Sequence, residues 1–127
     1  MNLFPDKEKP LLLTVDLKEN VMMLNDGILE ALKYPAQVQI LHNDATRRIA
    51  IRRCSLDDSQ AIAILGKRQA EIKERNIVNL VRKIAGWEQD SPRICIGEAD
   101  PNNPAVFFDL TKVITVETVG GSKKEDG

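Results

Sequence analysis

The sequence predicts an α+β domain built on a small, mostly antiparallel sheet or half-barrel that carries two short helices. The chain has 127 residues, 43% hydrophobic and 29% charged, as expected of one globular domain. Short runs rich in β-branched and aromatic residues recur along it between turn-forming residues. Two other segments repeat their apolar residues with the period of an amphipathic helix. We therefore expect strands to outnumber helices.

The first half of the chain predicts two hairpins with a helix between them. Turn-forming residues at 18–20 and 43–46 separate the strand-like runs. Asn25 and Asp26 can cap a short helix, which must end before Pro35. The expected strands are LLLTVDL (11–17), VMML (21–24), AQVQILH (36–42) and RRIAIRRC (47–54).

The second half predicts a helix followed by strands. From Asn76 onward, apolar residues follow helical spacing, and Gly86 is placed to end the helix. The strands expected after it are RICIG (93–97), AVFFDL (105–110) and KVITVETV (112–119). Residues 55–75 are hardest to assign. In that stretch AIAIL (61–65) is consistent with a short strand, and GKRQAEIKER (66–75) reads as an exposed linker or a frayed approach to the helix.

The chain is organised as an arm, one domain and a tail. We expect residues 1–10 to form a flexible arm, 11–119 a single α+β domain, and GGSKKEDG (120–127) a disordered tail. Residues 27–54 and 76–110 both read as helix, strand, turn and strand, each with an aromatic residue and a Pro after the helix, so 11–54 and 76–119 are possible halves of the domain. Two interpretations remain open, which are helix-hairpin half-repeats and two unrelated units of a common type.

Arginines surround the apolar centre of the strand at 47–54. Strand alternation places Ile49 and Ile51 toward the core, and Arg48 and Arg52 on the opposite face around Ala50. Their spacing of about 13 Å can bridge separate phosphates of a nucleic acid. Net charges of −3, +5 and −3 over 1–46, 47–93 and 94–127 also favour an anionic partner of the middle segment. The candidate nucleic-acid-binding residues are Arg47, Arg48, Arg52, Arg53, Lys67 and Arg68.

The same arginines have a structural interpretation. They can form the solvated rim of an ordinary strand, paired with Asp44, Asp57 or Asp58, and such exposed pairs add little stability. Charged strand residues also protect sheet edges from aggregation. In either interpretation, one of Phe107 and Phe108 must face away from the core, where exposure would favour self-association.

Residues 11–54, about a third of the chain, resemble a known family. In order and length, the elements from LTVDLKENVMML to RRIAIRRC resemble the AbrB/MazE-like swapped-hairpin DNA-binding domains of bacterial transcription regulators. The resemblance implies a dimer with interleaved strands and basic residues on DNA. The family usually has Pro and a basic residue where this chain has Asn25 and Asp26, so its DNA contacts do not transfer to numbered positions here. The chain also looks like short uncharacterised bacterial proteins that share Ile-Ala-Ile-Arg and Phe-Asp-Leu.

The sequence lacks the motifs of several common kinds of catalytic, metal-binding and phosphate-binding site. His42 is the only histidine, and no CxxC, HExxH or Walker-type glycine motif is present, so we expect no enzyme, metal, cofactor or small-molecule substrate. Cys54 and Cys95 are interpreted as two buried reduced thiols, with a disulfide between them as the alternative. Neither a signal peptide nor a membrane span is recognisable, so we expect a cytoplasmic protein that does not contact membranes.

Two function classes follow. The first is a small bacterial DNA-binding protein, a homodimeric transcription regulator that contacts duplex phosphates through the arginine-rich strand. The alternative is a protein-interaction or assembly module that does not bind nucleic acid, in which a sheet edge or apolar strand face binds another protein.

Overall fold

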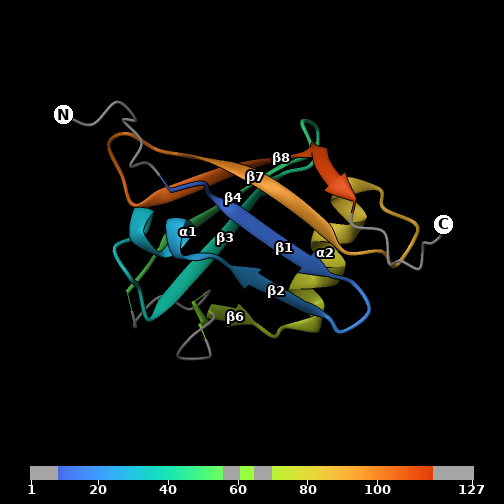
Figure 1. The fold of residues 1–127 in the computed structure, drawn as a ribbon, viewed down its shortest axis with the longest axis horizontal. Coiled ribbons are helices and arrows are strands. Elements are labelled where there is room, and N and C mark those ends of the chain that lie inside the picture. Colours follow the sequence, from blue (N-terminus) through green and yellow to red (C-terminus); the bar gives the residue numbers. More distant parts are fainter. Residues whose placement is uncertain (1–8, 56–60, 65–69, 116–127) are drawn as a thin grey trace, which may run out of the picture.

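A computed structural model of the chain describes residues 9–55, 61–64 and 70–115, in which eight strands and two helices are assigned (Figure 1). Helices α1 and α2 lie at the left and right of that view. In chain order the elements are β1 Leu12–Asp16, β2 Val21–Leu24, α1 Asp26–Ala31, β3 Gln37–Asn43, β4 Arg48–Arg53, β5 Ile62–Ala63, β6 Ala70–Ile72, α2 Arg75–Ala85, β7 Arg93–Ala99 and β8 Ala105–Thr115.

All eight strands form one antiparallel sheet, in the order β5-β3-β4-β8-β7-β1-β2-β6. Its two edge strands, β5 and β6, are neighbours in sequence. A flat sheet of this width would separate its edges by roughly 34 Å, whereas the chain from Ala63 to Ala70 spans at most about 25 Å. The covalent chain therefore requires the sheet to curl, and it is nearly barrel-shaped (Figure 1).

The hairpins of the two halves are interleaved in this sheet. The β7–β8 hairpin separates β3–β4 from β1–β2, so the two hairpins of the first half do not pair with each other. If the two edge strands are taken as neighbours, the sheet order closes into a ring. Exchanging β1 with β5, β2 with β6, β3 with β7 and β4 with β8 then gives the same ring, read in the opposite direction. Each set of four strands also has its helix between the second strand and the third. The first half thus depends on the second for its place in the sheet.

The concave side of the sheet and both helices share one apolar core. Asn25 caps α1 by accepting a hydrogen bond from the Ile28 amide at 3.0 Å. Gly86 ends α2 in the left-handed conformation, with φ of 78°. The largest fully buried side chains are Phe108, Leu13, Met22, Leu24, Ile28, Leu32, Ile49, Ile51, Ile72, Leu110, Val15 and Val38. Both helices thus cover the apolar side of the curled sheet and complete the core.

Most expected elements are confirmed, and so is the α+β class with a dominant sheet. The hairpins β1–β2 and β3–β4 lie where the alternation of residues predicts them. Helix α2 begins at Arg75 and places Val78, Val81 and Ile84 in the core. The outer parts of the arm and the tail, residues 1–8 and 116–127, lie outside the described residues.

Two expectations about strands are wrong. Residues 66–75 were expected to form a linker or a frayed helix, but Ala70–Ile72 is strand β6, because Ala70 and Ile72 cover the edge of β2 with buried side chains. Separate strands were expected at 105–110 and 112–119. Up to Thr115, however, one strand runs through both, because a bulge opposite Ile96 absorbs the extra residues 109–112.

Gly97 allows β7 and β8 to approach closely, so we predict that Gly97→Ala destabilises the fold. An added Cβ would lie 2.6 Å from Val106 Cγ1 and 2.7 Å from Phe108 Cε2, both in the core. Overpacking of this kind costs about 1–3 kcal/mol. Urea unfolding should show this loss, while the exposed neighbour replaced in Glu98→Ala should change stability by less than about 0.5 kcal/mol. Equal stability of the two variants would contradict the packing described here.

Candidate functional site

Of the four arginines at 47–53, two lie on the convex face of the sheet. Ile49 and Ile51 are buried on the concave side, as the alternation predicts. Arg48 and Arg52 therefore lie on the opposite side, one on each side of Ala50, and both are exposed. The predicted facing of this strand is confirmed.

The other two arginines leave this face. Arg47 precedes β4, in the hairpin turn, with φ of 56°, and its guanidinium lies near Gly86 at the C-terminus of α2. A cation in that position is favoured by the helix dipole. Arg53 Nη1 donates to the Lys33 carbonyl at 3.1 Å, beyond the end of α1. The four guanidinium groups thus do not form one patch, and the expected partners Lys67 and Arg68 lie outside the described residues.

Arg48 and Arg52 are only lightly held by the chain itself. Arg48 Nη2 is 3.9 Å from Asp109 Oδ2, at the outer limit of an ion pair, and the Arg48 side chain is 64% exposed. Arg52 Nε donates to the neutral Gln39 side chain at 2.7 Å. Both guanidinium groups therefore keep donors available for a further partner.

An apolar row lies between these two arginines and continues across three neighbouring strands. Leu41 pairs with Ala50, Ala50 with Phe107, and Phe107 with Glu98. Leu41 is 42% exposed and Phe107 is 44% exposed, and side chains in one such row are direct neighbours. We call this surface the β4–β8 face, and it consists of Leu41, Arg48, Ala50, Arg52, Glu98, Phe107 and Asp109.

The β4–β8 face carries fixed charges of both signs. Arg48 and Arg52 lie on β4, while Asp109 and Glu98 lie on β8 and β7. The Thr111 hydroxyl and amide donate to Asp109 Oδ1 at 2.6 and 3.0 Å, and these bonds hold the pKa of Asp109 below its usual range, with a smaller contribution from the Arg48 charge. The face therefore carries cations on β4 and carboxylates on β7 and β8, with an apolar row between them, and Lys112 of β8 lines the same hollow as Arg48, Glu98 and Asp109.

Two further arginines of the basic middle segment have structural partners. Arg82 donates to the carbonyls of Trp87 and Glu88 at 3.0 and 2.7 Å, and its Nη1 lies 2.8 Å from Asp90 Oδ1. Arg93 is buried, with its guanidinium 5.4 Å from the centre of the Trp87 ring. Both arginines hold the loop after α2 in place. Fewer cations are therefore available to a ligand than the net charge of residues 47–93 suggests.

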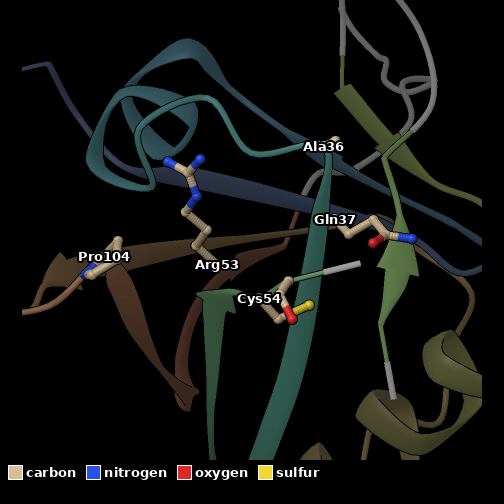
Figure 2. Close-up of a pocket in the computed structure, with 6 residues that line it drawn as sticks. Ala36, Gln37, Arg53, Cys54 and Pro104 are labelled. Carbon is tan, nitrogen blue, oxygen red and sulfur yellow. The ribbon is translucent and has the colours of Figure 1, made fainter. Parts of the chain in front are cut away.

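Arg53 also borders a pocket between β3 and the ends of β4 and the β7–β8 loop (Figure 2). Its side chain points toward the loop after α1, away from Gln37 and Cys54. The pocket is lined by Ala36, Gln37, Arg53, Cys54, Ser55 and Pro104. Residues 56–60, which follow its wall directly, lie outside the description, so we assign no ligand chemistry to it.

Chemical groups elsewhere do not converge on a second site. His42 Nδ1 lies 2.6 Å from Asp44 Oδ1 at the exposed β3–β4 turn. Asp100 accepts hydrogen bonds from the amides of Asn102 and Asn103, as is typical of a turn residue. Within residues 9–55, 61–64 and 70–115, we find no cluster of three or more metal-ligating side chains and no helix of the length and apolarity that a bilayer span requires.

Comparisons with family models, with curated proteins and with solved structures find no match to this chain.

Sequence reasoning found the arginines of the face but missed its apolar and anionic members. That one of the two adjacent phenylalanines faces outward follows from alternation, and Phe107 is the exposed one. That Phe107 lies beside Ala50, and Asp109 beside Arg48, follows only from the pairing of β4 with β8. The two strands are about fifty residues apart, so no local pattern carries this information.

The two cysteines are not joined to each other and differ in burial, which corrects the expectation that both are buried. Cys95 is buried in the core, whereas Cys54 follows the end of β4 and is half-buried, because it borders the pocket rather than the core. Burial raises the pKa of Cys95 from 9.0 to about 12. At pH 8 this lowers the thiolate fraction about a thousand-fold.

We predict that the Cys54→Ser variant reacts with Ellman's reagent at pH 8 only as fast as it unfolds, because Cys95 then provides the only thiol. The same variant in urea is the control and should react at once. Rapid stoichiometric labelling of the folded variant would contradict the burial of Cys95.

Proposed function

We propose that this domain is a protein-interaction module that binds its partner through the β4–β8 face. The observation that carries the proposal is the pair of exposed side chains Leu41 and Phe107, on either side of the buried Ala50, at the centre of a face that is charged on both sides of it. Interfaces commonly have such an apolar, aromatic centre within a polar rim. An exposed Phe is also a costly residue to leave in water.

The sheet behind the row supports this function in a second way. Phe107 and Ala50 are side by side on strands whose other faces carry Phe108 and Ile49 in the core. Their backbones are thus held in place before binding. A surface ordered in advance loses little conformational entropy on association, which leaves more of the contact energy for affinity.

Contact with duplex DNA is a second candidate, supported by the exposed Arg48 and Arg52 on one face. Against it, Asp109 and Glu98 lie on the same face and would meet the same phosphates. Arg47 and Arg53 are directed elsewhere. A surface that carries carboxylates among its cations attracts a polyanion more weakly than a purely basic one, so the interaction module is the better-supported function.

We also infer that the domain consists of two β-β-α-β-β half-repeats. The unchanged ring order on exchange of the halves supports this inference, and so does the place of each helix between the second and third strand of its half. The AbrB/MazE-like resemblance implies strands interleaved between two chains. In this proposal one chain supplies both sets, and a homodimer is not needed to complete the sheet.

The interaction proposal predicts position-specific cross-linking. With the photoreactive residue p-benzoylphenylalanine in place of Phe107, irradiated cells that express the chain should yield a discrete polypeptide adduct, since Phe107 lies at the centre of the interface. The same group at Tyr34, an exposed aromatic in the loop after α1, is the matched control and should yield none. Adding Leu41→Asp should remove the adduct. Equal adducts from both positions would contradict the proposal.

The DNA candidate is tested by fluorescence anisotropy on a labelled duplex. If Arg48 and Arg52 each neutralised one phosphate, affinity would fall about ten-fold between 50 and 200 mM salt, since each contact releases counterions. The interaction proposal predicts no measurable binding at 50 mM salt. Salt-dependent binding that is lost in the Arg48→Ala/Arg52→Ala variant, but kept in Arg82→Ala, would instead establish the DNA function.

A further inference from the structure

We propose that the partner of the β4–β8 face is a second copy of this chain, packed face to face about a two-fold axis that runs along the strands between β4 and β8. This inference rests on the proposed function and names its partner. Two features of the face support it, which are the complementary charges and the complementary sizes of the side chains that such an axis would bring together.

One pair of charges fits when the face is turned upon itself. This pair is Arg48 and Asp109, whereas Arg52 meets Ala105 and Glu98 meets Leu41. Arg48 and Asp109 are cross-strand neighbours on β4 and β8. A two-fold axis between these strands places β4 of one copy over β8 of the other, and each residue keeps its position along the strand direction. Arg48 then faces the second copy's Asp109, and symmetry repeats the pair. The long 3.9 Å contact within the chain leaves Arg48 donors for this second carboxylate.

The side-chain sizes fit under the same operation. In the next row, Ala50 and Phe107 are cross-strand neighbours, so Phe107 of each copy faces Ala50 of the other. Ala50 carries only a methyl group but is 8% exposed, so an incoming aromatic ring reaches it only if the neighbouring side chains move apart. Sheets stacked face to face lie about 10 Å apart, which is the separation at which large and small side chains interdigitate.

The other symmetric arrangement is unfavourable. An axis across the strands, through the row of Ala50 and Phe107, would place Arg48 against the second copy's Arg52 and Glu98 against itself. Like charges facing each other at an interface cost affinity. The positions of the charges thus select the axis along the strands.

The size of the face sets the expected strength of the dimer. Four strands and five residues of each give roughly 19 by 17 Å, which is below the area of a standard interface of about 800 Å² per partner. We therefore expect a reversible dimer with a dissociation constant between about 10 µM and 1 mM. The measurement must extend over that range of concentration.

Charge reversal on the full chain tests the proposal by sedimentation velocity. The wild-type mass should rise with concentration from 14.2 kDa toward twice that value. Arg48→Glu and Asp109→Arg should each weaken self-association at least ten-fold, because each places like charges across the interface twice. Lys83→Glu, a matched reversal on an exposed residue of α2, should dimerise like the wild type.

Mixing the two weakened variants is the decisive step. A heterodimer of Arg48→Glu with Asp109→Arg pairs opposite charges at both positions, so an equimolar mixture should dimerise within about three-fold of the wild type. Since each chain of the mixture still lacks its internal ion pair, recovery would come only from contacts between chains. Melting temperatures of the separate variants check that each is folded.

Three outcomes would overturn the proposal. They are a wild-type chain that stays monomeric to 1 mM, self-association that is unaffected by either reversal, and a mixture that does not recover. Cross-linking from position 107 to a different polypeptide, together with a monomeric wild type, would overturn the second-copy partner and leave the interaction module standing. No adduct of any kind from position 107 would remove both.

Discussion

The pairing of β4 with β8 is the contact on which the rest of this structure depends. It joins the two halves of the chain, because β4 ends the first hairpin pair and β8 ends the second. On its concave side it places Ile49 beside Phe108 in the core. On its convex side it places Ala50 beside Phe107, so one register determines both the packing of the interior and the composition of the β4–β8 face.

The distribution of arginine explains why, among the described residues, the positive charge of the middle segment does not gather on the β4–β8 face. Arg82 and Arg93 hold the loop after α2, and Arg53 is bonded beyond the end of α1. Arg48 and Arg52 remain on the β4–β8 face, where Asp109 and Glu98 balance them. A sum of charges along the sequence therefore overstates the field that a nucleic acid would meet, because folding brings acidic strands from elsewhere beside the basic one.

The sequence predicts local structure well here and long-range pairing not at all. Alternation in RIAIRR predicts which side of β4 enters the core, and Asn25 and Gly86 predict where helices begin and end. Strand β6 is missed because Ala70 and Ile72 become a strand only through the edge of β2. The anionic half of the β4–β8 face is missed for the same reason, since Asp109 meets Arg48 only through sheet order.

The most direct measurement of the central claim is an isotope-filtered NOE experiment on a mixture of labelled and unlabelled chains at millimolar concentration. The two-fold arrangement predicts intermolecular NOEs between the Phe107 ring and the Ala50 methyl group. The filter separates them from the contacts that the same residues make as cross-strand neighbours within one chain. Intermolecular NOEs confined to other surfaces, or none at a concentration at which the chain is dimeric, would contradict the account.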